Sequence, residues 1–339
     1  MVAMEIEKLV RAGVNLNVYT FHGGTNFNFW AGANFGRKYQ PTVTSYDDAA
    51  LLNEYGDYTK AYHKVRNILL TAQGKDVNAP LPARPRLQQV GWVALDQRAD
   101  LWRNLYVLGE KHHNPTPESM EYFGQNFGYI LYTKTLRGKY GPHTMYIEGV
   151  HDIAYVRING KLVKRYDRCR NGSLLRDYQK FCNDGFYCKV PAFEGELRIE
   201  ILVEGMGRVN YGPETENDRK GIQKVRLDYQ TLFDWDVYTL PMDHPEQADF
   251  SLAPQAGQPA ILRGTFRAEK GKDCFVDTKG FSKGIIFVNG FHLGRYWNRG
   301  PQRTLYLPAP ILKEENEIVI VEQEGYRDAR IFIGDKHRL

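Results

Sequence analysis

The sequence contains little cysteine. Only 4 of its 339 residues are cysteine, and they form no CxxC pair and have no histidine pair beside them. The ligand spacing of a zinc site is therefore missing, and we predict neither a metal nor a cofactor. Cys169, Cys182 and Cys188 nevertheless lie close together in the chain. Two interpretations stay open for them: one disulfide, if the protein is secreted, or three thiols packed in a loop.

Long apolar runs and clusters of one charge are also missing. No run approaches the roughly 18 apolar residues of a membrane-spanning helix, so we expect none. The start of the chain, MVAMEIEKLVRAG, carries charges at Glu5, Glu7 and Lys8 and lacks the apolar core of a signal peptide. The net charge of +5 is spread along the chain, which argues against a nucleic-acid partner because such partners need a basic patch.

The N-terminal part has helical patterns on either side of a short apolar run. Apolar positions recur at helical spacing over residues 3–10 and 61–72, and Asp57 is a suitable start for the second helix. Between them, VNLNVYTF (residues 14–21) predicts a short buried strand. This order is typical of the end of an α/β unit. A chain that begins within a helix also indicates a piece of something longer.

From residue 75 onward the pattern changes to β-structure. The stretch KDVNAPLPARPR has three prolines in twelve residues and predicts an extended linker. Apolar runs that predict strands occupy residues 128–136, 153–160, 196–204, 284–290 and 316–324. Asn159-Gly160 and Asn289-Gly290 each follow such a run and predict tight hairpins. Two antiparallel sandwiches of roughly 100 residues each explain this pattern, and a single large β-domain is the alternative.

The stretch TFHGGTNFNFWAGANF (residues 20–35) is the most unusual part of the chain, rich in glycine and rings. It lacks the glycine spacing of a phosphate-binding loop. His22-Gly23-Gly24 is also found in the oxyanion holes of esterases, and residues 280–284 fit GxSxG, with Asp328 and His337 following in order. However, an apolar strand pattern follows Ser282 where that fold needs a helix. We therefore reject the esterase interpretation.

A third interpretation places this stretch at the mouth of a (β/α)₈ barrel, where the loop after a strand borders the active site. Tyr19 then lies near the end of the last strand, and Asn26 and the rings line the rim. For Phe21, Phe27 and Phe29 simple core packing is the alternative.

The sequence of the loop is similar to that of the closing segment of the catalytic barrel in glycoside hydrolase family 35, the β-galactosidases. In the family, the sequence of this segment is close to MYMFHGGTNFGFWNGAN and is followed by TSYDYDAPLSEAGD. The similarity continues in the family's order through most of the chain, over residues 15–57, 124–136, 150–160, 201–212, 220–222 and 283–312.

The resemblance implies retaining hydrolysis of terminal β-galactosides, which uses two carboxyl groups roughly 5–5.5 Å apart. In the family both are glutamates on earlier barrel strands, and neither segment is present here, so we assign no catalytic residue. Asn53-Glu54-Tyr55-Gly56 spells the NEYG of an acid/base segment, but it aligns with SEAG after the TSYD motif. We interpret it as a chance match and not as the acid/base segment.

Two galactose contacts of the family fall inside this chain. One tyrosine matches Tyr19. The second tyrosine of TSYDYDAP aligns with Asp48, while Tyr46 and Asp47 match the preceding pair; a short anion there puts galactose recognition in doubt. The predicted substrate-binding residues are Tyr19, Tyr46 and Asn26.

The resemblance predicts a mainly β fold, in which two jelly-roll or galactose-binding-like sandwiches follow the last βα unit of a truncated barrel. The predicted parts are a barrel remnant (1–74), a linker with short strands (75–118), a first sandwich (119–241) and a second sandwich (242–339). We expect this chain to lack activity alone and to bind a β-galactoside or another glycan. The barrel remnant would be exposed unless a partner chain or the sandwiches cover it.

The family also implies a lysosomal, vacuolar or secreted location. The alternative function is a non-catalytic sandwich protein that binds carbohydrate or a partner through an exposed aromatic platform. Trp235 and Trp297 are its candidates, although core packing is the simpler role for each.

Overall fold

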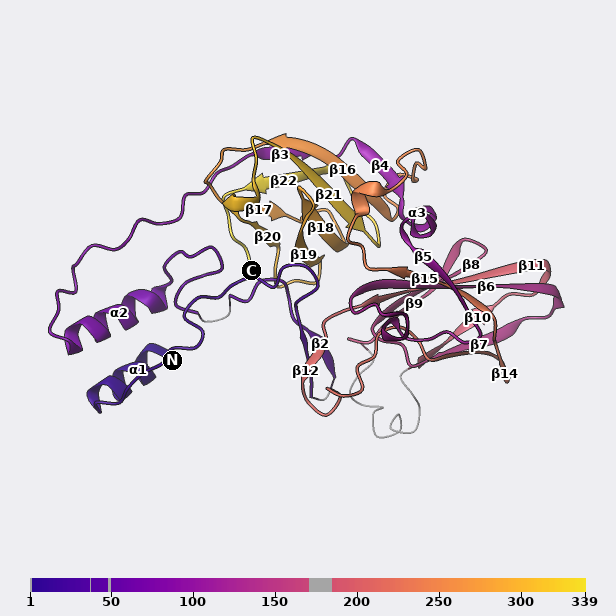
Figure 1. The fold of residues 1–339 in the computed structure, drawn as a ribbon, viewed down its shortest axis with the longest axis horizontal. Helices are drawn as coiled ribbons and strands as arrows, with labels where there is room; N and C mark the ends of the chain where they lie inside the picture. The colour runs from indigo at the N-terminus through magenta and orange to yellow at the C-terminus, as the bar shows by residue number, and fades with distance from the viewer. Residues whose placement is uncertain (1, 37, 48–49, 171–184) are drawn as a thin grey trace. The chain divides into compact units, whose positions relative to one another are not determined.

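The structure is a computed structural model that describes residues 2–36, 38–47, 50–170 and 185–339 (Figure 1). The chain is mainly β, as predicted, with helices near its start. It divides into two compact units. One comprises Met1–Asn28, Val43–Arg98 and Ala256–Leu339, and the other comprises Phe29–Thr42 and Ala99–Gln255.

The unit that contains Ala99–Gln255 is built around a β-sandwich. One sheet has the strand order β5 (Glu110–Asn114), β15 (Trp235–Leu240), β6 (Gly128–Tyr140), β11 (Phe193–Gly205), β8 (Ile153–Ile158) and β9 (Lys161–Asp167). The other has the order β10 (Gly185–Val190), β7 (His143–Glu148), β13 (Lys224–Leu227) and β14 (Gln230–Thr231). A short helix, α3 (Leu101–Leu108), was not predicted.

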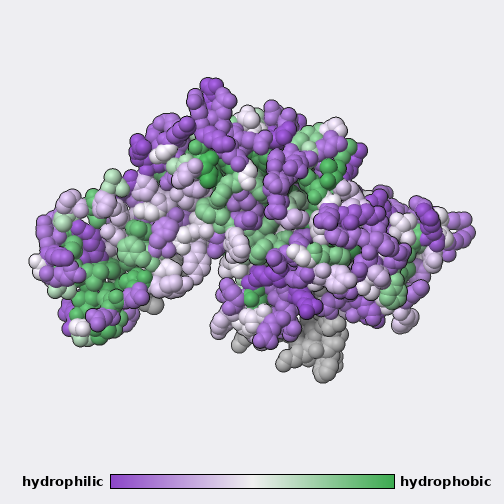
Figure 2. Space-filling model, viewed as in Figure 1, coloured by the Kyte–Doolittle hydropathy of each residue, from purple (hydrophilic) through white to green (hydrophobic). Residues whose placement is uncertain are grey.

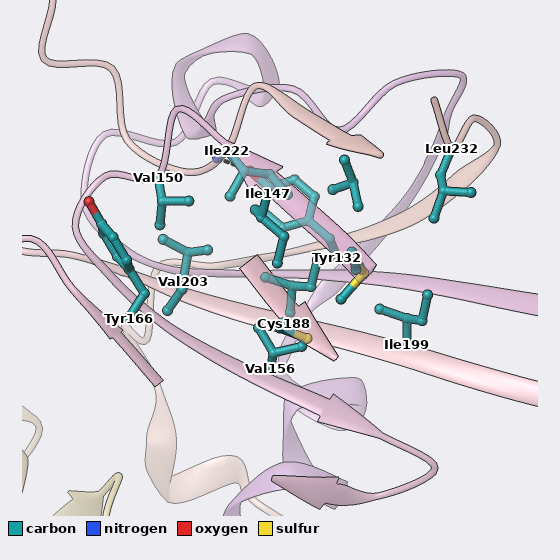
Figure 3. Close-up of a cluster of buried hydrophobic side chains, with 14 of the residues drawn as sticks. Tyr132, Ile147, Val150, Val156, Tyr166, Cys188, Ile199, Val203, Ile222 and Leu232 are labelled. Carbon is teal, nitrogen blue, oxygen red and sulfur yellow. Dashed lines mark hydrogen bonds between the residues drawn. The ribbon is translucent and has the colours of Figure 1, made fainter. Parts of the chain in front are cut away.

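Alternating residues of the two sheets form the core of this unit. Figure 3 shows Tyr132, Val156 and Ile199 of the larger sheet beside Ile147 and Cys188 of the smaller one. All five side chains are at most 5% exposed. Because successive strand residues point to opposite faces, the residues between them in sequence lie on the outer face of each sheet.

The unit that contains Ala256–Leu339 holds the second sandwich. Its five-stranded sheet has the order β19 (Phe291–Trp297), β18 (Lys283–Val288), β21 (Glu315–Glu322), β16 (Ala260–Arg267) and β4 (Gln97–Asp100). Its four-stranded sheet has the order β20 (Thr304–Leu307), β17 (Cys274–Asp277), β22 (Arg330–Gly334) and β3 (Gly91–Ala94). Buried residues of both sheets form one cluster.

Both predicted hairpins are confirmed. Asn159 and Gly160 join β8 to β9, and Asn289 and Gly290 join β18 to β19. The φ angles are 47° and 76° in the first loop and 53° and 79° in the second. Positive φ at both central residues is the requirement of a type I′ turn, which explains why asparagine and glycine occupy these positions.

The N-terminal helices are confirmed, but the strand between them is wrong. Helix α1 (Val2–Arg11) packs against α2 (Lys60–Ala72) through Ile6, Leu51 and Val65. Residues 14–18 have no regular structure. A strand needs neighbours for its backbone hydrogen bonds, and the described chain offers none to this run. Tyr19, which follows it, is 92% exposed.

The start of α2 also differs from the prediction. Thr59, not Asp57, is the N-cap, and its hydroxyl accepts a hydrogen bond from Tyr62 N at 3.2 Å. Figure 2 shows apolar side chains gathered over the two helices. Among the described residues, no helix combines the length and apolar character needed to cross a bilayer.

Residues 29–42 fold as part of the first sandwich unit. Strand β1 (Ala33–Phe35) lies between β12 (Val209–Tyr211) and β2 (Tyr39–Pro41) in a three-stranded sheet. Gly207 faces Gly32 so closely that a Cβ on it would lie 2.0 Å from Gly32 O. The absence of a side chain at Gly207 therefore allows the two backbones to meet.

A cluster of buried charges, which we call the four-charge cluster, lies beside this sheet and comprises Asp152, Arg168, Asp218 and Lys220. The Asp152 carboxylate is 2.7 Å from Arg168 Nη1 and 2.7 Å from Lys220 Nζ. Asp218 is 2.7 Å and 2.8 Å from the same two groups. Tyr39 donates its hydroxyl to Asp152 Oδ2 at 3.0 Å. Two buried cations therefore meet two buried anions.

Replacing Gly207 by alanine should release residues 29–42. The new methyl group would overlap backbone atoms that cannot move aside, and overpacking of this kind costs about 1–3 kcal/mol. Phe35 and Tyr39 are 6% and 1% exposed, so chymotrypsin should cleave beside them about tenfold faster in Gly207→Ala than in the wild type. In the control Gly141→Ala, where a Cβ meets nothing within 4 Å, the rate should not change. Equal protection in both variants would contradict the close packing.

The Asp152→Asn variant should lower the free energy of unfolding at pH 7 by about 3–5 kcal/mol, because it leaves buried positive charge uncompensated. Urea denaturation measures this value. The control Asp243→Asn, at an exposed position, should stay within about 0.5 kcal/mol of the wild type.

The difference should shrink in acid. Burial opposes ionisation of Asp152, but Lys220 and Arg168 beside it hold the pKa of this carboxyl well below its usual range. Its contribution to stability is thus present above the unfolded-state pKa of about 4 and is lost as pH falls through the lower folded-state pKa. A gap between variant and wild type that stayed constant far below pH 4 would contradict this assignment.

Candidate sugar-binding site

The glycine loop is held by a second loop, residues 44–54, through backbone hydrogen bonds. Gly23 N donates to Leu52 O at 2.9 Å, Asn26 N donates to Thr44 O at 2.7 Å, and Tyr46 N donates to Gly24 O at 3.0 Å. A Cβ on Gly23 would lie 2.7 Å from Asp47 Oδ1. The glycine therefore serves the close approach of two loops of the chain.

These loops are also attached to the second sandwich. Thr44 donates its hydroxyl to Arg295 O at 2.7 Å, and Ser45 N donates to the side chain of Gln302 at 2.9 Å. Thr44 is 1% exposed and Ser45 6%. The loop positions are thus fixed by the sandwich.

Two of the predicted sugar-binding residues, Asn26 and Tyr46, lie on these loops, and the third, Tyr19, directly precedes the glycine loop. The loops of Asn26 and Tyr46 are joined by the backbone bonds described above. The side chains of Tyr19 and Tyr46 are exposed, at 92% and 51%. In the part of the chain that the structure describes, neither phenol has a hydrogen-bond partner. Both are thus available to a ligand, and their role stays a prediction.

The predictions for Asp48 and for the cysteine cluster involve residues that the structure does not describe. Asp48, which aligns with the second galactose-contacting tyrosine, lies outside the described residues, and so does Cys182. Cys169 and Cys188 form no disulfide among the described residues. Burial raises the pKa of Cys188 to about 11, so this thiol stays protonated at neutral pH and is a poor nucleophile.

The rings of the glycine loop mostly pack instead of lining a rim. Phe27 lies edge-on to Phe291, with ring centroids 5.0 Å apart, and packs against the core of the second sandwich. Phe29 and Tyr129 both belong to the first sandwich unit. Phe29 is 3% exposed and its ring lies edge-on to that of Tyr129. Among these rings, Phe21 and Trp30 are well exposed, at 46% and 67%.

Glu54, the glutamate of the chance NEYG match, is buried and contacts His337 of the C-terminal segment. It is 3% exposed, accepts the Thr25 hydroxyl at 2.7 Å, and lies 2.9 Å from His337 Nε2. His337 Nδ1 is 3.7 Å from Asp47 Oδ2, and burial raises the pKa of Asp47. Sequence reasoning missed this cluster because 283 residues separate Glu54 from His337.

The esterase interpretation stays rejected. Ser282 immediately precedes strand β18, and its hydroxyl donates to Gly325 O at 2.6 Å. His337 contacts Glu54 rather than this serine. Within the described ranges, no group of three or more His, Cys, Asp or Glu side chains is arranged to bind a metal.

Neither tryptophan forms an open platform. Trp235 is fully buried and donates its indole N–H to Leu232 O at 2.9 Å. The ring of Trp297 is covered by Arg299, whose Cζ lies 3.9 Å from the ring centroid, and by Lys283 Nζ at 5.0 Å. A sugar could stack on the covered face of Trp297 only after displacing these groups, and Trp235 lies in the core.

Replacing His337 by alanine should weaken the attachment of the loops. It removes an imidazole that lies 2.9 Å from the buried Glu54 carboxylate, and loss of one partner of a buried polar group costs about 1–3 kcal/mol. Urea denaturation should show this loss. The neighbouring control is Arg338→Ala, which removes a half-exposed ion pair with Asp277 and should cost at most about 1 kcal/mol. An equal effect of both changes would contradict a specific role for His337.

Comparisons with known proteins agree with the resemblance along the chain. The family model "Glycosyl hydrolases family 35" matches residues 1–72. "Beta-galactosidase, first all-beta domain" matches residues 117–241, and "Beta-galactosidase, galactose-binding domain" matches residues 259–317.

Individual relatives show the same relation. The β-galactosidase of Xanthomonas manihotis is 36% identical over 311 residues, which are 90% of this chain and 49% of that protein. The human β-galactosidase-1-like protein 2 is 35% identical over 94% of this chain and 49% of its own length. The β-galactosidase of Bos taurus is 32% identical over 95% of this chain and 51% of its own length.

The chain thus spans about half the length of the curated relatives it matches. With these matches to its three family models, the chain belongs to glycoside hydrolase family 35, and it corresponds to the C-terminal portion of the family's β-galactosidases.

Proposed function

We propose that this chain is a non-catalytic part of a β-galactosidase-like protein and does not hydrolyse galactosides alone. The observation that carries the proposal is that the hydrolase family model matches only residues 1–72, where the described structure has two helices and two three-residue strands. A barrel needs eight strands to enclose its interior. Retaining hydrolysis also needs two carboxyl groups about 5–5.5 Å apart.

The carboxylates of the candidate site support the same proposal. The Glu54 carboxylate accepts a hydrogen bond from Thr25 and contacts His337. Burial raises the pKa of Asp47, which favours the neutral form of this carboxyl group. Neither carboxyl group is placed as a free nucleophile on a barrel strand. We assign to Tyr19, Asn26 and Tyr46 the contacts with a terminal galactose in a complete sugar pocket.

The apolar surface of the N-terminal helices supports a partner over residues 1–74. Met4, Leu9 and Val14 are 64%, 42% and 49% exposed, and clustered apolar surface of this kind marks interaction sites. We propose that further barrel structure, in the same or another chain, covers it. The domain limits given above, at residues 74, 118 and 241, belong to this proposal.

A lysosomal, vacuolar or secreted location is part of the same proposal. It rests on the family to which the chain belongs.

The test is hydrolysis of a chromogenic β-galactoside by the purified chain. We expect no turnover above a protein-free blank between pH 4 and pH 7, while the β-galactosidase of Xanthomonas manihotis at the same molar concentration provides the positive control. Turnover that remains proportional to the chain through successive purification steps, and is lost in Glu54→Gln, would contradict the proposal.

A further inference from the structure

A groove of about 650 Å³ lies on the first sandwich unit, remote in sequence from the glycine loop. Helix α3, the β8–β9 hairpin and strand β11 line it. Arg198 and Glu200 alternate with the core residues Ile199 and Ile201, so they belong to the outer face of the larger sheet. The groove is therefore separate from the hydrophobic core.

Two arginines of the groove are fixed on aromatic rings. The Cζ atom of Arg157 lies 4.5 Å from the ring centroid of Trp102, and that of Arg198 lies 4.8 Å from the ring of Tyr106. Arg157 also donates to Gly160 O from Nε, at 2.7 Å, and from Nη2, so Nη1 is the group of this side chain that is left for a ligand. Stacking occupies the flat face of a guanidinium and leaves N–H groups at its edge for a ligand. The arginines are thus oriented before any ligand arrives.

The positive charge in the groove exceeds its internal compensation. Among the described residues, no carboxylate lies within ion-pair distance of Arg103 or Arg157. Glu200 is 3.9 Å from Arg198 Nε, but its Oε1 already accepts the Tyr106 hydroxyl at 2.5 Å. Burial and the neighbouring Glu200 raise the pKa of Tyr106, so this hydroxyl keeps its proton and its hydrogen bond.

We propose that this groove binds an anionic saccharide, a sugar that carries a carboxylate or a sulfate. Guanidinium groups bind such planar or tetrahedral oxyanions through paired charge-assisted hydrogen bonds. A neutral sugar lacks this contact, and the faces of Trp102 and Tyr106 that it would stack on are covered by Arg157 and Arg198.

The walls of the groove favour a sugar over a nucleic acid. Asp100 caps helix α3 through Oδ1, and its other carboxylate oxygen is available to accept a sugar hydroxyl. Glu200 provides a second acidic group. These carboxylates would repel a chain of phosphates, which instead needs an extended basic stripe.

The direct test is isothermal titration of the full chain with galactose 6-sulfate, galacturonic acid, galactose and inorganic sulfate. We expect at least one of the two anionic sugars to bind at least about tenfold more tightly than galactose and inorganic sulfate, and its affinity to fall with added salt. If neither does, or if inorganic sulfate binds as tightly as the sugar, the proposal is overturned.

Variants assign binding to the groove. The double variant Arg157→Gln/Arg198→Gln should weaken binding about tenfold or more, since each lost hydrogen bond to a charged group weakens a complex by about that factor. The control Arg226→Gln also loses one stacked arginine, 5.0 Å from the Tyr146 ring and paired with Glu148, but lies on the other sheet and should bind normally. Equal losses in both would overturn the assignment.

The single variant Arg103→Gln keeps the test valid if the double variant fails to fold. Arg103 is exposed on α3, so its loss should leave thermal unfolding unchanged while binding weakens several-fold. Unchanged binding in every folded groove variant would overturn the proposal.

Discussion

The four-charge cluster of Asp152, Arg168, Asp218 and Lys220 is the interaction on which the first sandwich unit depends. Burying an ion costs several kcal/mol, and these four side chains are at most 7% exposed. Each charge is compensated by two opposite charges at 2.7–2.8 Å. The arrangement is stable only when every partner is in place, so it fixes the segments that carry them.

The cluster also fixes a segment from the hydrolase part of the family. Tyr39 donates its hydroxyl into the cluster, and Asp218 accepts Val209 N beside strand β1. A different set of contacts, from Thr44 to Arg295 and from Glu54 to His337, holds the neighbouring loops on the other sandwich. Each of the two sandwiches therefore supports part of these loops. This explains how the loops keep a defined structure although they contain little regular secondary structure.

Local patterns predicted the sandwiches well because strand alternation and Asn-Gly turns are properties of neighbouring residues. The predicted strands at residues 128–136 and 196–204 lie within β6 and β11, and the one at 316–324 overlaps β21 except for its last two residues. The apolar run at residues 14–21 misled us because a strand also needs partners, which periodicity does not show. Sequence likewise could not reveal the pairing of Glu54 with His337, or of Tyr39 with Asp152, since those contacts join positions more than a hundred residues apart.

Native-state hydrogen exchange of the unmodified chain tests most directly whether the sandwiches hold these loops. The amides of Asn26, Ala33 and Thr42 donate to backbone oxygens in the structure, and we expect their exchange to be slowed about a thousandfold or more, as an opening free energy of about 4 kcal/mol requires. The exposed Tyr19 segment should exchange nearly freely. Equally fast exchange at Asn26, Ala33 and Thr42 would contradict the account.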